Sequence, residues 1–538
     1  MKIIYKKNQK LKIFINKKKI NFDLNKDQNI DNCKKEFNKI IEKISSGHKD
    51  NIHYLTLKII ERNTLVHNLF EDLCLINLIK KYKTNGLEIY TNNVSLFLHF
   101  KPIANFTFFT GLYFRFVLVK NYTKPYVSLF NCFLKNLKFY FLYSNKKYRQ
   151  NLSKKFVFFS VLTSSSFKNG KINDLYSGYL TEARNMENRK VKIMPYLHEI
   201  ENLKYIIKKI RSKKDRFIVI HDYLNITDYF FIFKNFFYKR KIKFNSKLIF
   251  FNINVMNVFN HYLKKESSGI DIFYYKFFEK IRSNNVNFFL HHENNIIEKA
   301  IILGIRKFIK KTKIYGFFHM TNPKNLLNHE YTSSNAFEAS PKPDVFLFNS
   351  NKYKSIFEEK YPRIKGFNFP ALKQMYIKNA KNYSEQKKNK VILVILTGDI
   401  NENKFLLNLL NEPEFKNYQF LFRQHPFFLF DVKKHYKGSN YIMTNDDSLS
   451  SKRFLNVGAV ISGYSGLLVE FSLRGFPVGL IYQKDSIFKN PFDHTEIKNY
   501  VAINSKEKLI KFFKKPLFKK SKNNFFNLKK EISAKIFK

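Results

Sequence analysis

The sequence is poor in several residue types, and each scarcity excludes a class of protein. It has only 3 cysteines, Cys33, Cys74 and Cys132, with no CxxC pair or cysteine–histidine spacing. Neither a disulfide framework nor a zinc finger is therefore expected, and a reducing compartment fits best. Glycine (16) and proline (13) are rare among the 538 residues, which excludes collagen-like and low-complexity chains.

Acidic residues are also scarce compared with basic ones. The chain has 97 Lys and Arg against 42 Asp and Glu, so its formal net charge is 97 − 42 = +55. Only 14 of the 97 are arginine, whereas proteins that read nucleic acid often concentrate arginine on one element. Lys, Asn, Ile, Phe and Tyr are abundant throughout, as drift toward AT-rich codons would produce. We therefore expect no specific nucleic-acid partner, although the positive field would attract an anionic membrane surface.

Targeting and membrane-spanning segments are not evident either. Residues 1–19 are basic but lack the apolar core and small-residue cleavage site of a signal peptide. Residues 102–119 are apolar except for Asn105 and Arg115, which falls short of the roughly 20 apolar residues of a membrane span. This pattern favours a buried strand pair or an interfacial segment. We expect a cytoplasmic protein, and peripheral attachment to the inner face of the membrane is an open alternative.

A second aromatic-rich segment, residues 127–143, carries Lys135 and Lys138 three positions apart. It fits an amphipathic helix lying on a membrane. It equally fits a core helix with one edge in water, and the sequence does not decide between the two.

From about residue 156, short apolar runs alternate with longer amphipathic ones, such as 200–210 and 294–309. A repeated strand-then-helix order predicts a mostly parallel sheet covered on both faces. The predicted strands are 156–161, 191–195, 217–220, 248–251, 287–290, 314–318 and 345–349.

The alternation pauses at residues 371–389, which are polar and rich in lysine, and then resumes as a second doubly wound domain. Its predicted strands are 391–396, 418–422, 441–443, 457–461, 478–482 and 500–503, and its predicted helices are 402–410, 448–455 and 467–473.

These patterns predict an α/β protein with two Rossmann-like domains whose parallel sheets face each other across a cleft. We divide it into an N-terminal extension (1–150), an N-terminal domain (151–370), a linker (371–389) and a C-terminal domain (390–538). The extension is part of the N-terminal domain or associated with a membrane, and it contains a long helix at 59–80 and a strand at 87–90. Ligands of such sheets bind beyond the carboxyl ends of the strands.

In the C-terminal domain, two strand ends carry candidate anion-binding groups. Ser462 and Ser465 stand in an S-G-Y-S-G turn between a strand and a helix, where hydroxyls and N–H groups can bind phosphate, although Ser465 could equally be a simple helix cap. Glu470 lies one turn into that helix and could reach a ribose diol. Arg423 and His425, in the R-Q-H-P sequence after another strand, offer a guanidinium fork and an imidazole donor.

In the N-terminal domain, the polar sequence His291-His292-Glu293-Asn294 follows a strand and opens a helix. Glu293 suits a general base, or a carboxylate that is simply favoured by the helix dipole. His319 ends the next strand. Because the glutamate adjoins the histidines rather than following an H-E-x-x-H spacing, we expect no metal site.

Taken from the N-terminal to the C-terminal domain, the motifs around Glu293, His319, Arg423 and Ser462 resemble those of GT-B-fold glycosyltransferases of bacterial surface-carbohydrate biosynthesis. These glycosyltransferases are related to bacterial polysialyltransferases and to CDP-glycerol glycerophosphotransferases. Their products include the capsule and lipopolysaccharide of the cell surface. The resemblance covers about residues 155–485 and includes residues 173–180, which are similar to a first helix of such N-terminal domains. The chain departs from the pattern at Gly463 and Gly466, where an acidic residue and a second serine are common.

The resemblance implies that Arg423, His425, Ser462, Ser465 and Glu470 bind a nucleotide-sugar donor. Glu293 and His319 would then be catalytic, beside a glycan or glycolipid acceptor, with no metal and no cofactor. The alternatives are transfer of a polyol phosphate from a CDP-glycerol type of donor, and a basic nucleic-acid- or membrane-surface-binding protein without catalysis.

Overall fold

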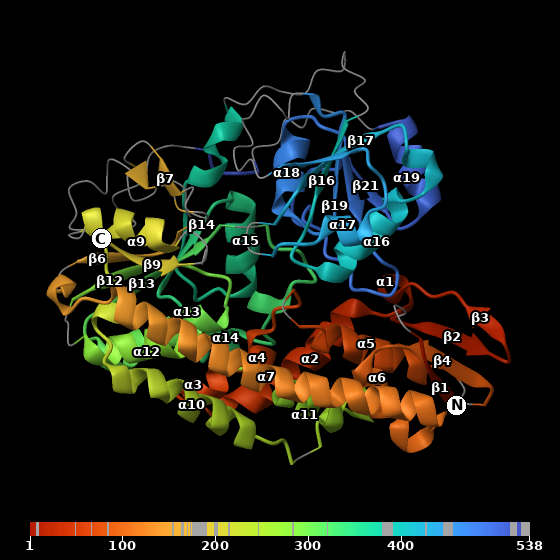
Figure 1. Ribbon diagram of the computed structural model, residues 1–538, viewed down its shortest axis with the longest axis horizontal. Helices are drawn as coiled ribbons and strands as arrows, with labels where there is room; N and C mark the ends of the chain where they lie inside the picture. Colours follow the sequence, from red (N-terminus) through yellow and green to blue (C-terminus); the bar gives the residue numbers. More distant parts are fainter. Residues whose placement is uncertain are drawn as a thin grey trace.

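The computed structural model has three sheets of five or six strands, together with two short two-stranded sheets, in its described residues (Figure 1). It describes all residues except 7–9, 49, 66, 83–84, 153–154, 163–165, 169–170, 173, 175–190, 198–202, 214–215, 246, 282–284, 320, 379–390, 426–427, 445–455, 517–524 and 529–538. The predicted helix at 448–455 and most of 173–180 lie outside the described residues.

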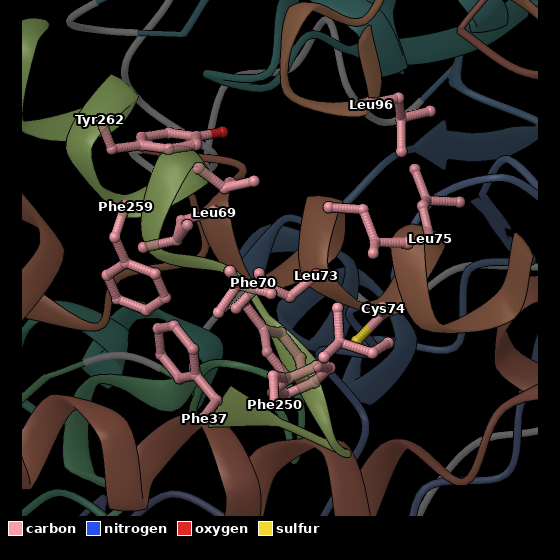
Figure 2. Close-up of a cluster of buried hydrophobic side chains, with 14 of the residues drawn as sticks. Phe37, Leu69, Phe70, Leu73, Cys74, Leu75, Leu96, Phe250, Phe259 and Tyr262 are labelled. Carbon is pink, nitrogen blue, oxygen red and sulfur yellow. The ribbon is translucent and has the colours of Figure 1, made fainter. Parts of the chain in front are cut away.

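The first sheet is mixed, with the strand order β3-β2-β4-β1-β5. Its strands are β1 (Lys2–Tyr5), β2 (Lys12–Ile15), β3 (Lys18–Ile20), β4 (Leu87–Thr91) and β5 (Asn105–Phe106). Helices α2 (Ile30–Ser46), α5 (Leu69–Lys80) and α6 (Val94–Phe100) accompany this sheet. Figure 2 shows the shared core, in which Phe37, Phe70 and Leu73 meet Phe250 and Phe259 from much later in the chain.

The predicted long helix at 59–80 is wrong, because the chain forms two helices there, α4 (Lys58–Glu61) and α5. The break begins at Arg62, whose backbone is left-handed with φ of 58°. The Arg62 side chain is buried, donates to the backbone carbonyl of Glu330, and lies 4.0 Å from the ring centre of Tyr331. Long-range contacts of one arginine therefore end a helix that the local apolar pattern would continue.

Of the two structures predicted for 102–119, the buried strand pair is wrong. Beyond β5, residues Phe108–Tyr143 form one 36-residue helix, α7, which includes Pro125. Its buried side chains, among them Phe114, Leu129 and Phe133, recur at helical spacing. The apolar residues on the outer side of α7 hid this period in the sequence. Among the described residues, no helix combines the length and apolar character needed to cross a bilayer.

The second sheet is six-stranded and parallel, in the order β15-β14-β13-β12-β6-β9. Its strands are β6 (Phe156–Leu162), β9 (Val191–Leu197), β12 (Asn287–His291), β13 (Lys313–Phe318), β14 (Val345–Phe348) and β15 (Gly366–Asn368). Its helices include α9 (Leu203–Ser212), α10 (Ile226–Lys241), α12 (Asp271–Lys280), α13 (Ile296–Phe308) and α15 (Asn351–Lys360). Every side chain of β6 is buried, as expected for a strand covered on both faces.

Two predicted strands of this domain do not join the parallel sheet. At 217–220, Phe217 makes a single bridge to Ile193, and the chain then turns into a short 3-10 helix, Ile220–Asp222. Buried Asp222 fixes that turn by pairing with Arg211 at 2.7 Å. At 248–251, β10 (Ile249–Phe250) instead pairs with β11 (Ile253–Asn254) in an antiparallel hairpin. The turn residues Phe251 and Asn252 both have positive φ, which matches a tight hairpin turn.

The third sheet is also six-stranded and parallel, in the order β18-β17-β16-β19-β20-β21. Its strands are β16 (Val391–Ile395), β17 (Gln419–Arg423), β18 (Tyr441–Thr444), β19 (Ala459–Ser462), β20 (Val478–Ile481) and β21 (Tyr500–Ile503). Helices α16 (Ile400–Leu410), α18 (Gly466–Leu473) and α19 (Lys506–Lys514) belong to this part. The predicted α/β class with two Rossmann-like parallel sheets is thus confirmed.

The two parallel sheets are packed together rather than merely linked. One apolar cluster contains Phe318 and Phe348 from the second sheet together with Leu393 and Val460 from the third. Near the C-terminal end, Asn527 donates from its N–H to the Asn349 carbonyl at 2.8 Å. The chain thus returns to the second sheet after completing the third. The predicted domain boundaries at 150, 370 and 390 stay predictions.

Candidate functional site

The carboxyl ends of β12 and β13 bring Glu293 and His319 together. The Glu293 Oε1 atom lies 3.1 Å from His319 Nε2, and the Glu293 side chain keeps 23% of its surface exposed while that of His319 keeps 5%. The Nδ1 atom of His319 is buried. Of this pair, the carboxylate of Glu293 is therefore the group that a bound molecule could reach.

Burial opposes ionisation of Glu293, but the hydrogen bond from His319 and nearby histidines outweigh it and lower the pKa of the Glu293 carboxyl. Burial likewise lowers the pKa of His319, although Glu293 acts in the opposite direction. At neutral pH these shifts give an ionised Glu293 that accepts a hydrogen bond from a neutral His319. Such a carboxylate can accept a proton or orient a hydroxyl group.

The backbone around Glu293 is fixed by the start of α13. The helix begins with a capping box between Asn295 and Glu298, and the Glu293 N–H also donates to the Glu298 carboxylate, at 2.9 Å to Oε2. Glu298 is buried, and burial raises the pKa of its carboxyl well above the ordinary value. The order of polar residues that opens this helix therefore serves two purposes, capping the helix and presenting Glu293.

A second histidine–carboxylate pair lies beside the first and was missed from the sequence. His291 Nε2 is 3.2 Å from Asp174 Oδ1, and the His291 and His319 rings lie 5.3 Å apart. Asp174 accepts from the Ser160 hydroxyl and the Val161 N–H, both at 2.7 Å. Because Ser160 and Val161 belong to β6, this pair joins the ends of β6 and β12. The strand order changes direction between these two strands, where α/β sheets bind ligands.

In the third sheet, Arg423 and Ser462 stand level with each other on either side of β16. Both are register partners of Ile395, so their Cα atoms are about 10 Å apart at the usual strand spacing. Arg423 is partly exposed at the end of β17, as is His425 two residues later. The His425 ring lies 5.1 Å from that of Phe428, a side chain that is 57% exposed. Pro426 lies outside the described residues.

The two predicted serines occupy different environments. Ser462 is fully buried, and its hydroxyl donates to the Ile395 carbonyl at 2.8 Å. Ser465 is partly exposed and caps α18, accepting from the Leu467 N–H at 3.4 Å. The simple capping role is therefore present at Ser465, and only this serine has an exposed side chain at the sheet edge.

Glu470 lies inside the protein rather than on the surface of α18. It is 4% exposed, and its Oε1 atom accepts a hydrogen bond from Gln374 Nε2 at 3.3 Å. Gln374 belongs to the 3-10 helix Leu372–Lys378, which precedes the third sheet in the chain. This contact ties α18 to that segment.

Glu402 is a further residue at this edge that the sequence did not single out. Its Oε2 atom accepts from the Tyr464 N–H at 3.2 Å and from the Thr397 hydroxyl at 3.1 Å. Burial, followed by the charge of Asp399, raises the pKa of the Glu402 carboxyl to about 7. A Cβ atom at Gly463 would lie 2.3 Å from Glu402 Oε2. Gly463, noted above as a departure from the resembled pattern, thus makes room for a carboxylate from another helix.

The edges of the two parallel sheets meet beside these residues. The Tyr464 hydroxyl donates to the Thr321 carbonyl at 3.0 Å, and Thr321 follows His319 by two positions. A Cβ atom at Gly466 would lie 3.6 Å from Thr321 Oγ1. The turn after β19 therefore touches the loop after β13, with Ser465 and His319 each within two residues of this contact.

A large hollow in the surface lies away from the strand-end residues described above. It has a volume of about 1060 Å³ and is lined by residues that include His48, Lys234, Tyr275 and Lys307. None of the strand-end residues above lines it. We define the candidate site by the chemistry of the two sheet edges, because polar groups converge there. Among the described residues, no three His, Cys, Asp or Glu side chains are grouped so that they could hold a metal ion.

No protein-family model matches the chain, and no curated protein matches it. Among solved structures, it is similar to UDP-GlcNAc 2-epimerase from Neisseria meningitidis, with 11% identity, a TM-score of 0.36, and coverage of 67% of this chain and 90% of that one. The calicheamicin glycosyltransferase CalG4 has 10% identity and a TM-score of 0.34, covering 67% and 90%. The wall teichoic acid polymerase TagF has 12% identity and a TM-score of 0.33, covering 72% and 89%. These similarities are too low to carry an argument about function.

Proposed function

We propose that this protein is a metal-independent glycosyltransferase that moves a sugar from a nucleotide-sugar donor to a surface polysaccharide or a lipid-linked acceptor. The observation that carries the proposal is the contact between Tyr464 and Thr321. This contact supports a site in which the Glu293–His319 pair of one parallel sheet works together with Arg423, His425 and Ser465 of the other. Transfer between a bound anionic donor and an acceptor hydroxyl needs these two chemistries at one place.

On the donor side, Arg423 and His425 would contact the phosphates, and Ser465 would add a hydroxyl. A guanidinium fork suits phosphate oxygens, and these groups are partly exposed. We propose that Ser462 acts from within the sheet by holding the turn, through its bond to Ile395. Buried Glu470 would fix α18 near the ribose rather than lie open to solvent.

On the acceptor side, Glu293 would take the proton of the attacking hydroxyl. The acceptor oxygen forms a bond to the anomeric carbon, and the bond from that carbon to the phosphate oxygen breaks. The electron pair leaves with the nucleotide phosphate, where Arg423 and His425 offset its charge. His319 would position Glu293 and keep it ionised through the 3.1 Å contact.

A binding panel tests the proposal. Thermal shifts of the full chain are measured with UDP, GDP, CMP and CDP, and with single-stranded DNA, at physiological salt. A nucleotide should give the largest shift, and Arg423→Ala should reduce it while Glu279→Gln, a carboxylate change on the outer surface of α12, should not. A largest shift with DNA would contradict the proposal. Preference for CDP, followed by transfer from CDP-glycerol, would favour the polyol-phosphate alternative.

Metal independence has a separate test. Once a donor has been identified, turnover should be unchanged by EDTA, because the proposed site offsets the phosphate charge with Arg423 and His425. Loss of turnover in EDTA that a divalent cation restores would contradict this part of the proposal.

A further inference from the structure

The outward face of α7 is a continuous apolar stripe on a helix that is about 54 Å long at 1.5 Å per residue. Six of its exposed large side chains are separated by three, four or eleven positions, which keeps them on one side of a helix. Phe116 is 67% exposed and Phe108 is 78% exposed. The stripe includes Phe108, Leu112, Phe116, Val119, Phe130 and Leu134.

The opposite face of α7 packs against the protein, so the helix is anchored. Phe114, Leu129 and Phe133 are buried on that side. In Figure 1, α7 (orange) runs along the side of the molecule away from the third sheet (blue). Helix α10 packs beside it and adds Phe230, which is 56% exposed and whose ring lies 5.2 Å from that of Phe133. The exposed apolar surface therefore extends across two helices.

Charge of one sign accompanies the stripe. The sequence contains no Asp or Glu from residue 89 to residue 173. Helix α7 carries five cations, and none of them forms an ion pair with an acidic residue in the described part of the chain. These cations are all exposed: Arg115, Lys120, Lys124, Lys135 and Lys138.

We propose that this α7 face docks on the surface of an anionic lipid bilayer, with the aromatic side chains among the acyl chains and the lysines at the headgroups. An apolar face bordered by cations has the chemistry of an interfacial helix. A second copy of the chain is a poorer occupant, because two such faces would bring like charges together with no acidic partner in this segment. The docking does not depend on the identity of the transferred group.

The test uses the full chain and sedimentation with two kinds of vesicle, phosphatidylcholine alone and phosphatidylcholine with one third phosphatidylglycerol. Replacing Lys120, Lys124 and Lys135 by Gln should weaken binding to anionic vesicles on the order of 100-fold. A matched control replaces Lys433, Lys437 and Lys508, which are exposed on the third-sheet domain, and should change binding less than about threefold.

A second pair of variants isolates the apolar contribution. Phe116→Ser with Phe130→Ser should weaken binding at least about 30-fold. Ile249→Ser with Ile442→Ser, which removes two other exposed apolar side chains, should leave binding nearly unchanged. Thermal unfolding of each variant checks that the fold is kept, and the three exposed lysines provide the test if the phenylalanine variant unfolds.

Several results would overturn the docking proposal. Equal binding of the α7 variants and their controls is one. Loss of a dimer in light scattering, with vesicle binding unchanged, would assign the face to a second copy. Retention in vesicles through alkaline carbonate would indicate embedding rather than surface docking. Nucleotide binding in solution should persist in all of these variants, so failure of the docking proposal is distinguishable from failure of the proposed enzymatic function.

Discussion

The two parallel sheets place polar groups at equivalent edges but treat their charges differently. At the second sheet, Glu293 is paired with His319, and His291 with Asp174, and the histidines are almost fully buried. At the third sheet, Arg423 and His425 are partly exposed. One edge thus pairs nearly buried histidines with carboxylates, whereas the other carries a guanidinium and an imidazole that are partly exposed. The same topology can therefore support proton transfer at one edge and anion binding at the other.

The largest effect should come from removing the accessible carboxylate of the paired edge. We expect Glu293→Gln to lower turnover by about 10²–10⁴, with nucleotide affinity nearly unchanged, because the side chain keeps its shape and loses only its charge. Single-turnover rates and calorimetry with the preferred nucleotide would measure both quantities. If Glu293→Gln abolishes nucleotide binding while His425→Ala leaves it intact, the roles of the two edges are reversed.

At the cationic edge, Arg423→Ala should weaken nucleotide binding by about 10–100-fold, since a charge-assisted contact to phosphate is lost. Ser462→Ala is the matched control from the neighbouring strand end. It removes a buried hydrogen bond and should cost about 1 kcal/mol of unfolding free energy, with little change in nucleotide affinity. A large loss of affinity in Ser462→Ala would show that its hydroxyl reaches the donor.

The pairing of Glu293 with His319 should be visible in the pH dependence of turnover. The contact with His319 lowers the pKa of Glu293 against the effect of burial. His319→Ala removes the largest influence that opposes burial, so the pKa of Glu293 should rise and the acid limb of the profile should move to higher pH. His319→Gln keeps a side-chain donor and should move it less. An unchanged limb in both variants would contradict the positioning role.

The smallest effect should come from Glu402, the carboxyl at the cationic edge. As the pH rises through its pKa of about 7, this group becomes charged beside the Tyr464 N–H and should repel a donor phosphate. Nucleotide affinity should therefore fall about 3–10-fold between pH 6 and pH 8, a size typical of a partly screened charge. Glu402→Gln should remove most of this dependence, and calorimetry at the two pH values would measure it.

Most strands of the two parallel sheets were predictable, because each is a short apolar run between polar turns. The strand predicted at 217–220 is wrong for a reason outside its own sequence. The Asp222–Arg211 ion pair turns the chain away from the parallel sheet after the single bridge from Phe217 to Ile193. The strand-pair prediction at 102–119 failed because α7 carries apolar side chains on its outward face as well as its inward one. A helix that is apolar on two sides and a pair of buried strands have similar compositions, so composition alone could not separate them.

The site was predictable as a set of strand ends but not as a set of contacts. Glu293 and His319 follow adjacent strands, and the α/β pattern places such ends at one edge. Asp174 and Glu402 gave no comparable signal. Asp174 comes from a segment between β8 (Lys171–Ile172) and β9, and Glu402 looked like an ordinary residue of a helix start. Their partners, His291 and Tyr464, are 117 and 62 positions away.

The sequence by itself determined the α/β class, the two alternating regions and the positions of the polar strand ends. These properties depend on residues within about one element of each other, where side-chain periodicity and turn chemistry act. Only the tertiary structure decided that α7 is one helix, that Ser462 is buried while Ser465 is partly exposed, and that Tyr464 contacts Thr321. Those outcomes depend on strand order and on packing between segments far apart in the chain, which the local sequence pattern cannot predict.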